Sequence, residues 1–131
     1  MDSLSPFHTV PDAEWIASNA TGFSIWDLFP VNPGHALVVP HRVAGRWWDL
    51  TPHEQAGLLE LVARTRAIID DLHQPAGYNV GFNDGVAAGQ TVSQLHIHVI
   101  PRYPQDVPDP RGGVRHVIPA RGNYLLNPAT P

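Results

Sequence analysis

Two imidazoles stand two residues apart in the stretch TVSQLHIHVIPR, residues 91–102. On a β-strand, alternate residues share a face and lie roughly 6.5–7 Å apart. We therefore predict that Gln94, His96 and His98 line one face, and that the apolar residues between them line the other. A neutral imidazole, with a pKa near ~6.5, is a competent nucleophile at neutral pH. This pattern favours attack on phosphorus, followed by release of the transferred group to water.

Phosphorus chemistry needs two further kinds of group, and the sequence offers both. A proton donor must assist the departing oxygen, and other donors must hold the nonbridging oxygens. Gln90 and Thr91 lead directly into the histidine strand. The glycine-bearing stretch NDGVAAGQ, residues 83–90, offers backbone amides suited to an anion.

Two other interpretations of the histidine strand stay open at this point. One face of an antiparallel sheet is often solvated, and polar residues can stand there without a chemical role. A histidine pair on one strand also suits zinc, with His35 as a third ligand. Against zinc, the chain has no cysteine, and no carboxylate lies within the histidine strand.

The elements that must position these residues are an antiparallel sheet and one long helix. Thr51 begins the sequence TPHE, which is a capping box with Pro52 at the first helical position and Glu54 reaching back. Apolar residues then keep helical spacing to about residue 73. Alternating or apolar runs predict strands at residues 23–29, 35–40, 78–83 and 93–101. The order β-β-α-β-β predicts an α+β fold, a single domain with one helix packed on the sheet.

The C-terminal part of the chain differs in composition from the rest. From Arg102 onward it is rich in proline and glycine, which predicts ordered coil or a mobile tail. The run VRHVIP, residues 114–119, is interpreted as a short edge strand. We divide the chain into a domain at residues 1–103 and an extension at 104–131 that packs on or near it. Arg102 either reaches a distal phosphate with its planar fork or is a surface charge.

Size and composition limit the classes of function. The chain has 131 residues, 43% of them hydrophobic, which suits one domain with a real core. A net charge of −4 argues against nucleic acid as a partner. No apolar run approaches the ~18 residues of a membrane helix, and no basic, apolar leader opens the sequence. We therefore expect a cytoplasmic protein without a membrane partner and, lacking cysteine, without disulfides.

Taken together, these motifs resemble the histidine triad (HIT) superfamily of nucleotide hydrolases and transferases. Its signature alternates three histidines with apolar residues, and QLHIHVI puts Gln94 in the place of the first. The loop NDGVAAGQTV is similar to the one before that signature in the fragile-histidine-triad-like branch. PVNPGHALVVPHR resembles the upstream strand, and DLTPHEQAGLLELV resembles the capped helix. The matching elements run in the family's order from about Phe23 to Arg102.

The resemblance implies a hydrolase or nucleotidyl transferase acting at the α-phosphate of nucleoside 5′-phosphate derivatives. The reaction would pass through a covalent nucleotidyl–histidine, with dinucleoside polyphosphates as the best substrate guess. By position, the resemblance implies that His96 is the nucleophile, that His98 assists the leaving or bridging oxygen, and that His35 is an additional site histidine. It implies phosphate or loop contacts for Asn83, Gln90 and Thr91. It also implies that Asp27 contacts the ribose. An apolar base pocket would draw on Phe23, Trp26 or Leu28, which are otherwise sheet core.

Gln94 is the departure from the family pattern. An amide donates and accepts hydrogen bonds but does not titrate near neutrality. We expect it to brace His96 or the site backbone, which leaves His98 as any general acid. The alternatives are a nucleotide-binding sensor with little turnover, a nucleoside phosphoramidase, or a metal-dependent hydrolase using His35, His96 and His98. In the preferred interpretation the enzyme needs no cofactor and no metal in the site, although Mg²⁺ can accompany a polyphosphate substrate. By analogy with the family we expect a homodimer.

Overall fold

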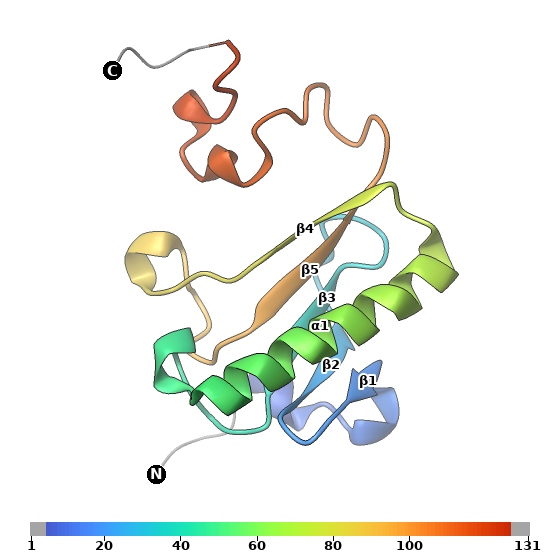
Figure 1. Cartoon of the computed structure of the whole chain (residues 1–131), viewed down its shortest axis with the longest axis vertical. Coiled ribbons are helices and arrows are strands. Elements are labelled where there is room, and N and C mark those ends of the chain that lie inside the picture. The colour runs from blue at the N-terminus through green and yellow to red at the C-terminus, as the bar shows by residue number, and fades with distance from the viewer. Residues whose placement is uncertain (1–4, 127–131) are drawn as a thin grey trace.

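Five strands form one antiparallel sheet in the computed structural model, which describes residues 5–126 (Figure 1). The strands are β1 (Ala17–Ser18), β2 (Gly22–Trp26), β3 (Ala36–Pro40), β4 (Gly77–Gly81) and β5 (Ile97–Arg102). Their order across the sheet is β1-β2-β3-β5-β4, and every neighbouring pair is antiparallel. The order sets β3 beside β5, where Leu37 pairs with His98. The predicted α+β fold is confirmed.

Helix α1 (Pro52–His73) packs on one face of this sheet (Figure 1). It begins as predicted: the Thr51 hydroxyl accepts from the Glu54 backbone N–H at 3.1 Å, and the Glu54 carboxylate accepts from the Thr51 N–H at 3.0 Å. Halfway along the helix, the buried Thr65 hydroxyl donates to the Ser24 hydroxyl of β2 at 2.8 Å. The cap fixes where α1 starts, and the buried hydroxyl pair fixes how it sits on the sheet.

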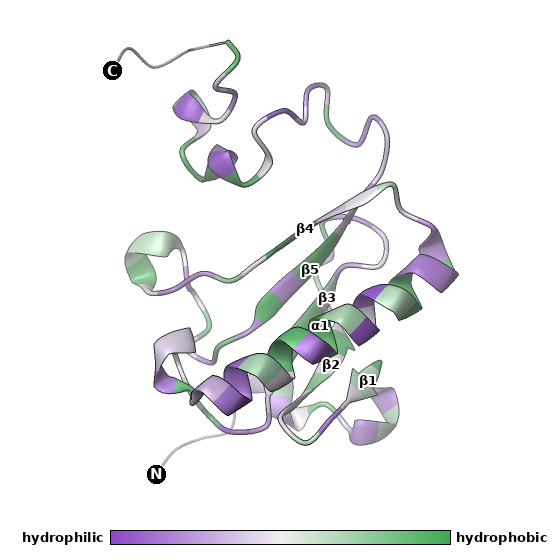
Figure 2. Ribbon diagram, viewed as in Figure 1, coloured by the Kyte–Doolittle hydropathy of each residue, from purple (hydrophilic) through white to green (hydrophobic). Residues whose placement is uncertain are grey.

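The two faces of the sheet are covered by different parts of the chain. In β3, Ala36 and Val38 belong to the cluster under α1, whereas Leu37 and Val39 belong to a second cluster on the opposite face. The N-terminal segment, residues 6–15, covers this second cluster through Phe7, Val10 and Trp15. Figure 2 shows the hydrophobic stripe of α1 against the apolar strands. Because paired residues point to the same side of a sheet, the Leu37–His98 pair sets the histidine on the face away from α1.

Several expected strand bounds are wrong. Strand β2 ends at Trp26 rather than at residue 29, and β4 ends at Gly81 rather than at residue 83. Strand β5 begins at Ile97 rather than at residue 93, so Gln94 lies before the strand. Pairing cannot start earlier because the Leu95 N–H donates to the Ala44 carbonyl, in the loop after β3. The run VRHVIP is not an edge strand: residues Gly113–Val117 form a 3₁₀ turn, closed by bonds such as Arg115 N–H to the Gly112 carbonyl.

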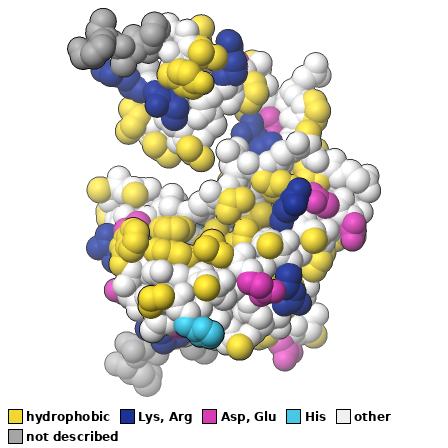
Figure 3. Space-filling model, in the orientation of Figure 1, with side chains coloured by type: hydrophobic (Ala, Val, Ile, Leu, Met, Phe, Trp, Pro, Cys, Tyr) yellow, Lys and Arg dark blue, Asp and Glu magenta, His cyan; other side chains and the backbone are white. Residues whose placement is uncertain are grey.

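Short 3₁₀ turns complete the described chain. They are Pro6–Thr9, Asp12–Glu14, Trp47–Asp49, Val86–Ala88, Gly113–Val117 and Pro119–Arg121. Residues 103–126 leave the sheet at the end of β5 and form a lobe beyond β4, with a hollow between lobe and body (Figure 3). Within the described chain, no helix combines the length and the apolar character that crossing a bilayer demands.

Candidate active site

Three imidazoles gather on the sheet face away from α1. The ring centroids of His96 and His98 lie 5.0 Å apart, and those of His35 and His98 lie 5.2 Å apart. Ile97, between His96 and His98, and Val99, after His98, are buried in the cluster under α1. The period-two alternation therefore separates histidines from core, as predicted, and the turn before β3 adds the third ring.

His35 is held by the turn that precedes β3. Gly34 has a φ of +86°, and a Cβ there would meet the His73 ring at 2.8 Å, so this turn requires glycine. The Asp27 N–H donates to the His35 carbonyl at 3.0 Å, which closes the hairpin. The His35 ring, only 3% exposed, is thereby fixed beside β5.

A chain of hydrogen bonds sets the proton positions on two of the rings. The Val31 backbone N–H donates to Nδ1 of His35 at 3.1 Å, so the neutral His35 ring carries its proton on Nε2. That Nε2–H donates to Nδ1 of His98 at 2.9 Å, with the Asp27 carboxylate 3.3 Å from the same nitrogen. The neutral His98 ring consequently carries its own proton on Nε2, where it can be donated to a bound molecule.

His96 has the opposite tautomer. Its Nδ1–H donates to the backbone carbonyl of Gln94 at 2.8 Å, so the Nε2 lone pair is free to act. The Phe7 ring lies against the imidazole, with centroids 4.8 Å apart, and limits its rotation. Neighbouring rings thus present one lone pair and one N–H, which suits a nucleophile next to a hydrogen-bond donor.

Gln94 lies just before β5, and Leu95 packs into the cluster under α1 with Ile97 and Val99, so the alternation continues back to Gln94, whose side chain is buried rather than open on the histidine face. It is 2% exposed and forms a clasp to the loop after β3. Its amide oxygen accepts from the Ala44 N–H at 3.0 Å, and its amide nitrogen donates to the Arg42 carbonyl at 3.2 Å. Since its main-chain carbonyl also accepts from Nδ1–H of His96, the clasp holds the atom that orients the His96 ring.

The His98 and His35 rings are neutral at physiological pH because they are buried. Burial is the main reason that the pKa of His98 falls to about 4, and the neighbouring His96 and His35 lower it further while Asp27 opposes them. Burial also lowers the pKa of His35, against a smaller opposing effect of Asp27. The tautomers deduced for His35 and His98 therefore describe the working protonation state of these two rings.

The residues predicted to contact phosphate differ in whether their side chains are already hydrogen-bonded or exposed. Both ends of the Gln90 amide are engaged in the loop before β5: its oxygen accepts from the Gly85 N–H and its nitrogen donates to the Gly45 carbonyl, each at 2.9 Å. Gln90 therefore shapes the loop. Thr91 and Asn83 are exposed. Gly81 pairs with His98, so the register continued past β4 sets Asn83 across from His96.

The base-pocket residues expected from the sequence do not come together. Phe23 is buried in the sheet, stacked on Trp15 at 4.6 Å. Trp26 packs edge-on against His73 at the end of α1, and Leu28 is 87% exposed in the turn. Of the three, Phe23 alone belongs to the second cluster, which supplies the apolar side chains on the histidine face together with Ile25 and Leu37.

Arg102 does not point at the histidines. Its guanidinium donates twice to the Asp106 carboxylate, at 2.8 Å each, and once to the Asn79 amide oxygen at 2.6 Å. These bonds lower the pKa of Asp106 well below its usual range and anchor the extension to the sheet. The suggested contact with a distal phosphate is not what this geometry favours.

Sequence reasoning missed three contributors to the site. Phe7 touches His96 from a distant part of the chain, and no local pattern announces it. Val31 contributes a main-chain N–H, which side-chain motifs cannot reveal. At Gly81, opposite His98, a Cβ would meet no atom within 4 Å, so the space beside that ring is open. A glycine in an otherwise ordinary strand was the one available signal.

Comparison with known proteins identifies relatives of the same architecture. The family model described as HIT domain matches residues 9–105. The bis(5′-nucleosyl)-tetraphosphatase [asymmetrical] of Schizosaccharomyces pombe is 42% identical over 80 residues, covering 61% of this chain and 44% of the relative. The AP-4-A phosphorylase of Mycobacterium tuberculosis is 36% identical over 107 residues, covering 77% and 55%. This chain thus spans about half the length of these curated relatives.

A solved structure agrees with these matches. The crystal structure of the Caenorhabditis elegans NitFhit protein superposes with a TM-score of 0.74 and 33% identity, covering 90% of this chain and 28% of that one. Membership of the same family therefore accounts for both the fold and the order of the motifs along the chain.

Proposed function

We infer, because this chain belongs to the HIT domain family, that it is a nucleotide hydrolase or nucleotidyl transferase acting at the α-phosphate of nucleoside 5′-phosphate derivatives. Dinucleoside polyphosphates are the proposed substrates, a choice that the names of the curated relatives support. The observation that carries the proposal is the pair of opposite tautomers, a free Nε2 on His96 and an N–H on Nε2 of His98.

The first step forms the bond from Nε2 of His96 to the α-phosphorus and breaks the bond from phosphorus to the bridging oxygen. The ring becomes positively charged as the bond forms. Its Nδ1–H already donates to the Gln94 carbonyl, and that bond strengthens with the charge. Asn83, Thr91 and the amides of residues 83–90 are proposed to hold the nonbridging oxygens.

The leaving group departs past His98. A neutral imidazole gives a hydrogen bond to the departing oxygen but yields its proton reluctantly. A phosphate leaving group, whose second pKa is near ~6, is stable without that proton. An amine leaving group needs full protonation, so the neutral state of His98 favours phosphoanhydrides over the phosphoramidate alternative.

In the second step, water attacks the phosphorus of the nucleotidyl–histidine, which releases a nucleoside monophosphate and restores His96. If inorganic phosphate attacks in place of water, the product is a nucleoside diphosphate. The names of the two curated relatives, a tetraphosphatase and a phosphorylase, indicate water as the acceptor in one and phosphate in the other. Product analysis with and without added phosphate distinguishes the two outcomes.

The direct test is to trap the intermediate. Diadenosine tetraphosphate labelled in the adenosine is mixed with protein and quenched in denaturant at neutral to alkaline pH within milliseconds to seconds. Label should remain on the wild-type chain, be released by acid, and be absent in His96→Ala. Production of monophosphate by His96→Ala at the wild-type rate would contradict the proposal. Stoichiometric tight nucleotide binding without product would instead favour the sensor alternative.

The metal alternative fits the donor atoms less well. Among the described residues, the donors close enough to share one cation are those of Asp27, His35 and His98, within 4.8 Å of one another, and not the expected set of His35, His96 and His98. However, Nδ1 of His35 accepts the Val31 N–H, so Nε2 carries the proton. A cation bound to that Nε2 would move the ring proton to Nδ1, where the ring N–H would face the Val31 N–H, and two donors cannot bond each other. This argument supports covalent catalysis at His96.

We also propose a homodimer. Strand β4 (Gly77–Gly81) is an edge of the sheet, and its Val80 is 43% exposed. An unpaired edge is a ready template for pairing with a second copy. Light scattering should give twice the chain mass, and Val80→Lys should shift the protein toward monomer; a monomeric wild type would contradict this.

A further inference from the structure

The turn between β2 and β3, residues 27–35, carries the groups that place protons on two of the site histidines. Val31 supplies the main-chain N–H that bonds Nδ1 of His35, and the Asp27 carboxylate lies 3.3 Å from Nε2 of the same ring. Both groups favour the proton on Nε2 of His35, from which it is donated to Nδ1 of His98. The position of this turn therefore decides which nitrogen of His98 carries a proton toward the substrate.

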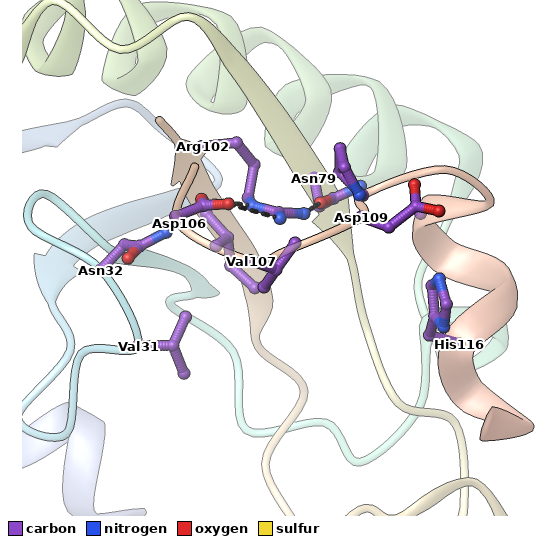
Figure 4. Close-up of a pocket in the computed structure, with 11 residues that line it drawn as sticks. Val31, Asn32, Asn79, Arg102, Asp106, Val107, Asp109 and His116 are labelled. Atoms are coloured by element: carbon purple, nitrogen blue, oxygen red, sulfur yellow. Dashed lines mark hydrogen bonds and ion pairs between the residues drawn. The ribbon is translucent and has the colours of Figure 1, made fainter. Parts of the chain in front are cut away.

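Apolar packing does little to hold this turn. Leu28, Phe29 and Val31 are 87%, 85% and 66% exposed. Toward the extension, the turn borders a cavity of about 410 Å³ that Val31 and Asn32 help to line (Figure 4). Segments with few buried apolar contacts open at a low cost in free energy. The His35 N–H to the Asn32 carbonyl, at 3.2 Å, helps set the shape of the turn, so its place on the sheet depends on bonds to other parts of the chain.

The end of β5 and the start of the extension supply those bonds. The Tyr103 hydroxyl donates to the Pro33 carbonyl at 2.6 Å, and the Asp106 carboxylate accepts from the Asn32 amide at 2.8 Å. The same amide nitrogen of Asn32 donates to the Pro101 carbonyl at 3.0 Å. Three hydrogen bonds therefore join the turn to one short segment of the chain.

Asp106 is itself held firmly. Figure 4 shows its carboxylate between Asn32 and the guanidinium of Arg102, which donates to it twice at 2.8 Å. The Tyr103 backbone N–H donates to the same carboxylate at 3.0 Å. Chiefly because of the Arg102 bonds, the pKa of Asp106 lies well below its usual range. The carboxylate is therefore ionised, and an ionised acceptor makes a strong hydrogen bond to the Asn32 amide.

We propose that Tyr103 and Asp106 are positioning residues, which hold the turn so that His35 and His98 keep their tautomers. If the turn shifts, the Val31 N–H leaves Nδ1 of His35, and the ring proton can occupy that nitrogen. The His98 proton then moves to Nδ1 to bond the freed lone pair of His35, and Nε2 of His98 loses its N–H. Resting on the proposed function, this loss removes the donor at the bridging oxygen and slows turnover.

The first test measures the tautomers directly. Tyr103→Phe removes only the hydroxyl that bonds the turn, and Asn32→Ala removes the amide. The matched control is Tyr124→Phe, since Tyr124 is half exposed on the same extension and its hydroxyl makes no hydrogen bond within residues 5–126. Nitrogen-15 NMR of histidine-labelled protein at neutral pH should show Nε2–H alone on His35 and His98 in wild type and in the control. Both strap variants, Tyr103→Phe and Asn32→Ala, should add an Nδ1–H form on each ring.

The second test measures kcat and KM for diadenosine tetraphosphate. Tyr103→Phe should lower kcat about fivefold and Asn32→Ala about tenfold, roughly the effect of one or more hydrogen bonds on a barrier. KM should change less than kcat, because the lost donor acts on an oxygen that gains charge in the transition state. Tyr124→Phe should keep both wild-type values.

The outcomes separate this proposal from the proposed function. If both strap variants keep the wild-type tautomers, the positioning role is overturned, whatever happens to stability or turnover. A tautomer shift with an unchanged kcat would overturn the effect on turnover. Because the NMR measurement needs no substrate, a failure to label His96 would overturn the proposed function and leave the tautomer test standing. If Asn32→Ala does not fold, Tyr103→Phe, which removes one oxygen atom, decides the question.

Discussion

The Nδ1 nitrogen of His96 lies 2.8 Å from the main-chain carbonyl of Gln94, and the side chain of that same glutamine is locked to the backbone at Arg42 and Ala44. One residue thus links the orientation of the His96 ring to the loop after β3. The position where the family signature has a histidine is filled here by a buried amide that holds backbone groups.

The clasp predicts what Gln94→His will do. A neutral imidazole can also accept from one backbone N–H and donate to one carbonyl, whereas an imidazolium cannot accept. At pH 8 we expect kcat/KM within about threefold of wild type, with an added loss below about pH 6.5 that wild type lacks. A large gain at every pH would instead show that the native site is handicapped at this position. The measurement is a pH profile of both proteins.

Gln94→Leu should damage the fold as well as the site. It leaves the Ala44 N–H and the Arg42 carbonyl unpaired next to a buried side chain. Each such loss costs about 1–3 kcal/mol, so for the two groups we expect a decrease of about 2–6 kcal/mol in the free energy of unfolding. Denaturant titration measures it, with exposed Gln74→Leu at the end of α1 as the control.

Acid should destabilise the protein through His98. Its pKa is about 4 in the folded chain against an ordinary 6.5, so the unfolded chain binds the proton first as pH falls. Stability is therefore complete above about pH 6.5 and declines toward pH 4. One pKa unit is about 1.4 kcal/mol, and after allowance for solvent screening of a partly exposed ring we expect a loss of about 2 kcal/mol.

The variant His98→Gln should flatten that decline, because an amide takes up no proton in this range. Unfolding followed by denaturant at several pH values between 4 and 7 measures the slope. A slope identical in wild type and His98→Gln would contradict the assignment. The Arg102–Asp106 pair does not confuse the result, since the depressed pKa of Asp106 puts its titration at lower pH.

Gly81 should control space beside His98. Because a Cβ at this position meets nothing within 4 Å, Gly81→Leu is expected to fold with a Tm close to wild type. Its side chain would occupy the open space opposite His98 and lower kcat/KM at least about tenfold, roughly the effect of 1.4 kcal/mol on the barrier. Gly77→Leu is the matched control in the same strand, opposite Arg102 and away from the histidines. Equal losses in both variants would contradict the prediction.

Chelation should leave catalysis intact. The proposed covalent step uses no bound cation, so dialysis against EDTA should not change the rate of label transfer to His96. Elemental analysis of the same samples is the accompanying measurement. Tight zinc at one ion per chain, whose removal abolishes label transfer, would favour a site at Asp27, His35 and His98.

The sequence predicted the fold because its strongest signals are local. The capping box at Thr51 and the alternation at Ile97 and Val99 each depend on neighbours within one turn or one strand. The resemblance to a family then assigned His35, which no local pattern ties to His98. The alternation around His96 and His98, together with the family position of His35, was enough to predict that the three imidazoles lie together.

The errors came from contacts that span the chain. The start of β5 was misjudged because the clasp from Gln94 to Arg42 joins residues 52 positions apart. The phosphate contact of Gln90 stays a prediction, and the sequence did not show that both ends of its amide bond Gly85 and Gly45. A side chain's chemistry can be read from its type, whereas its availability depends on partners that only the folded chain supplies.

The Val31 contact has a consequence for how this site tolerates change. The group that dictates the proton placement on His35, and through it on His98, belongs to the peptide bond at position 31 and not to the valine side chain. Substituting Val31 by any residue other than proline therefore keeps this N–H and the proton positions on both rings. Proline has no N–H and would remove the donor that fixes them.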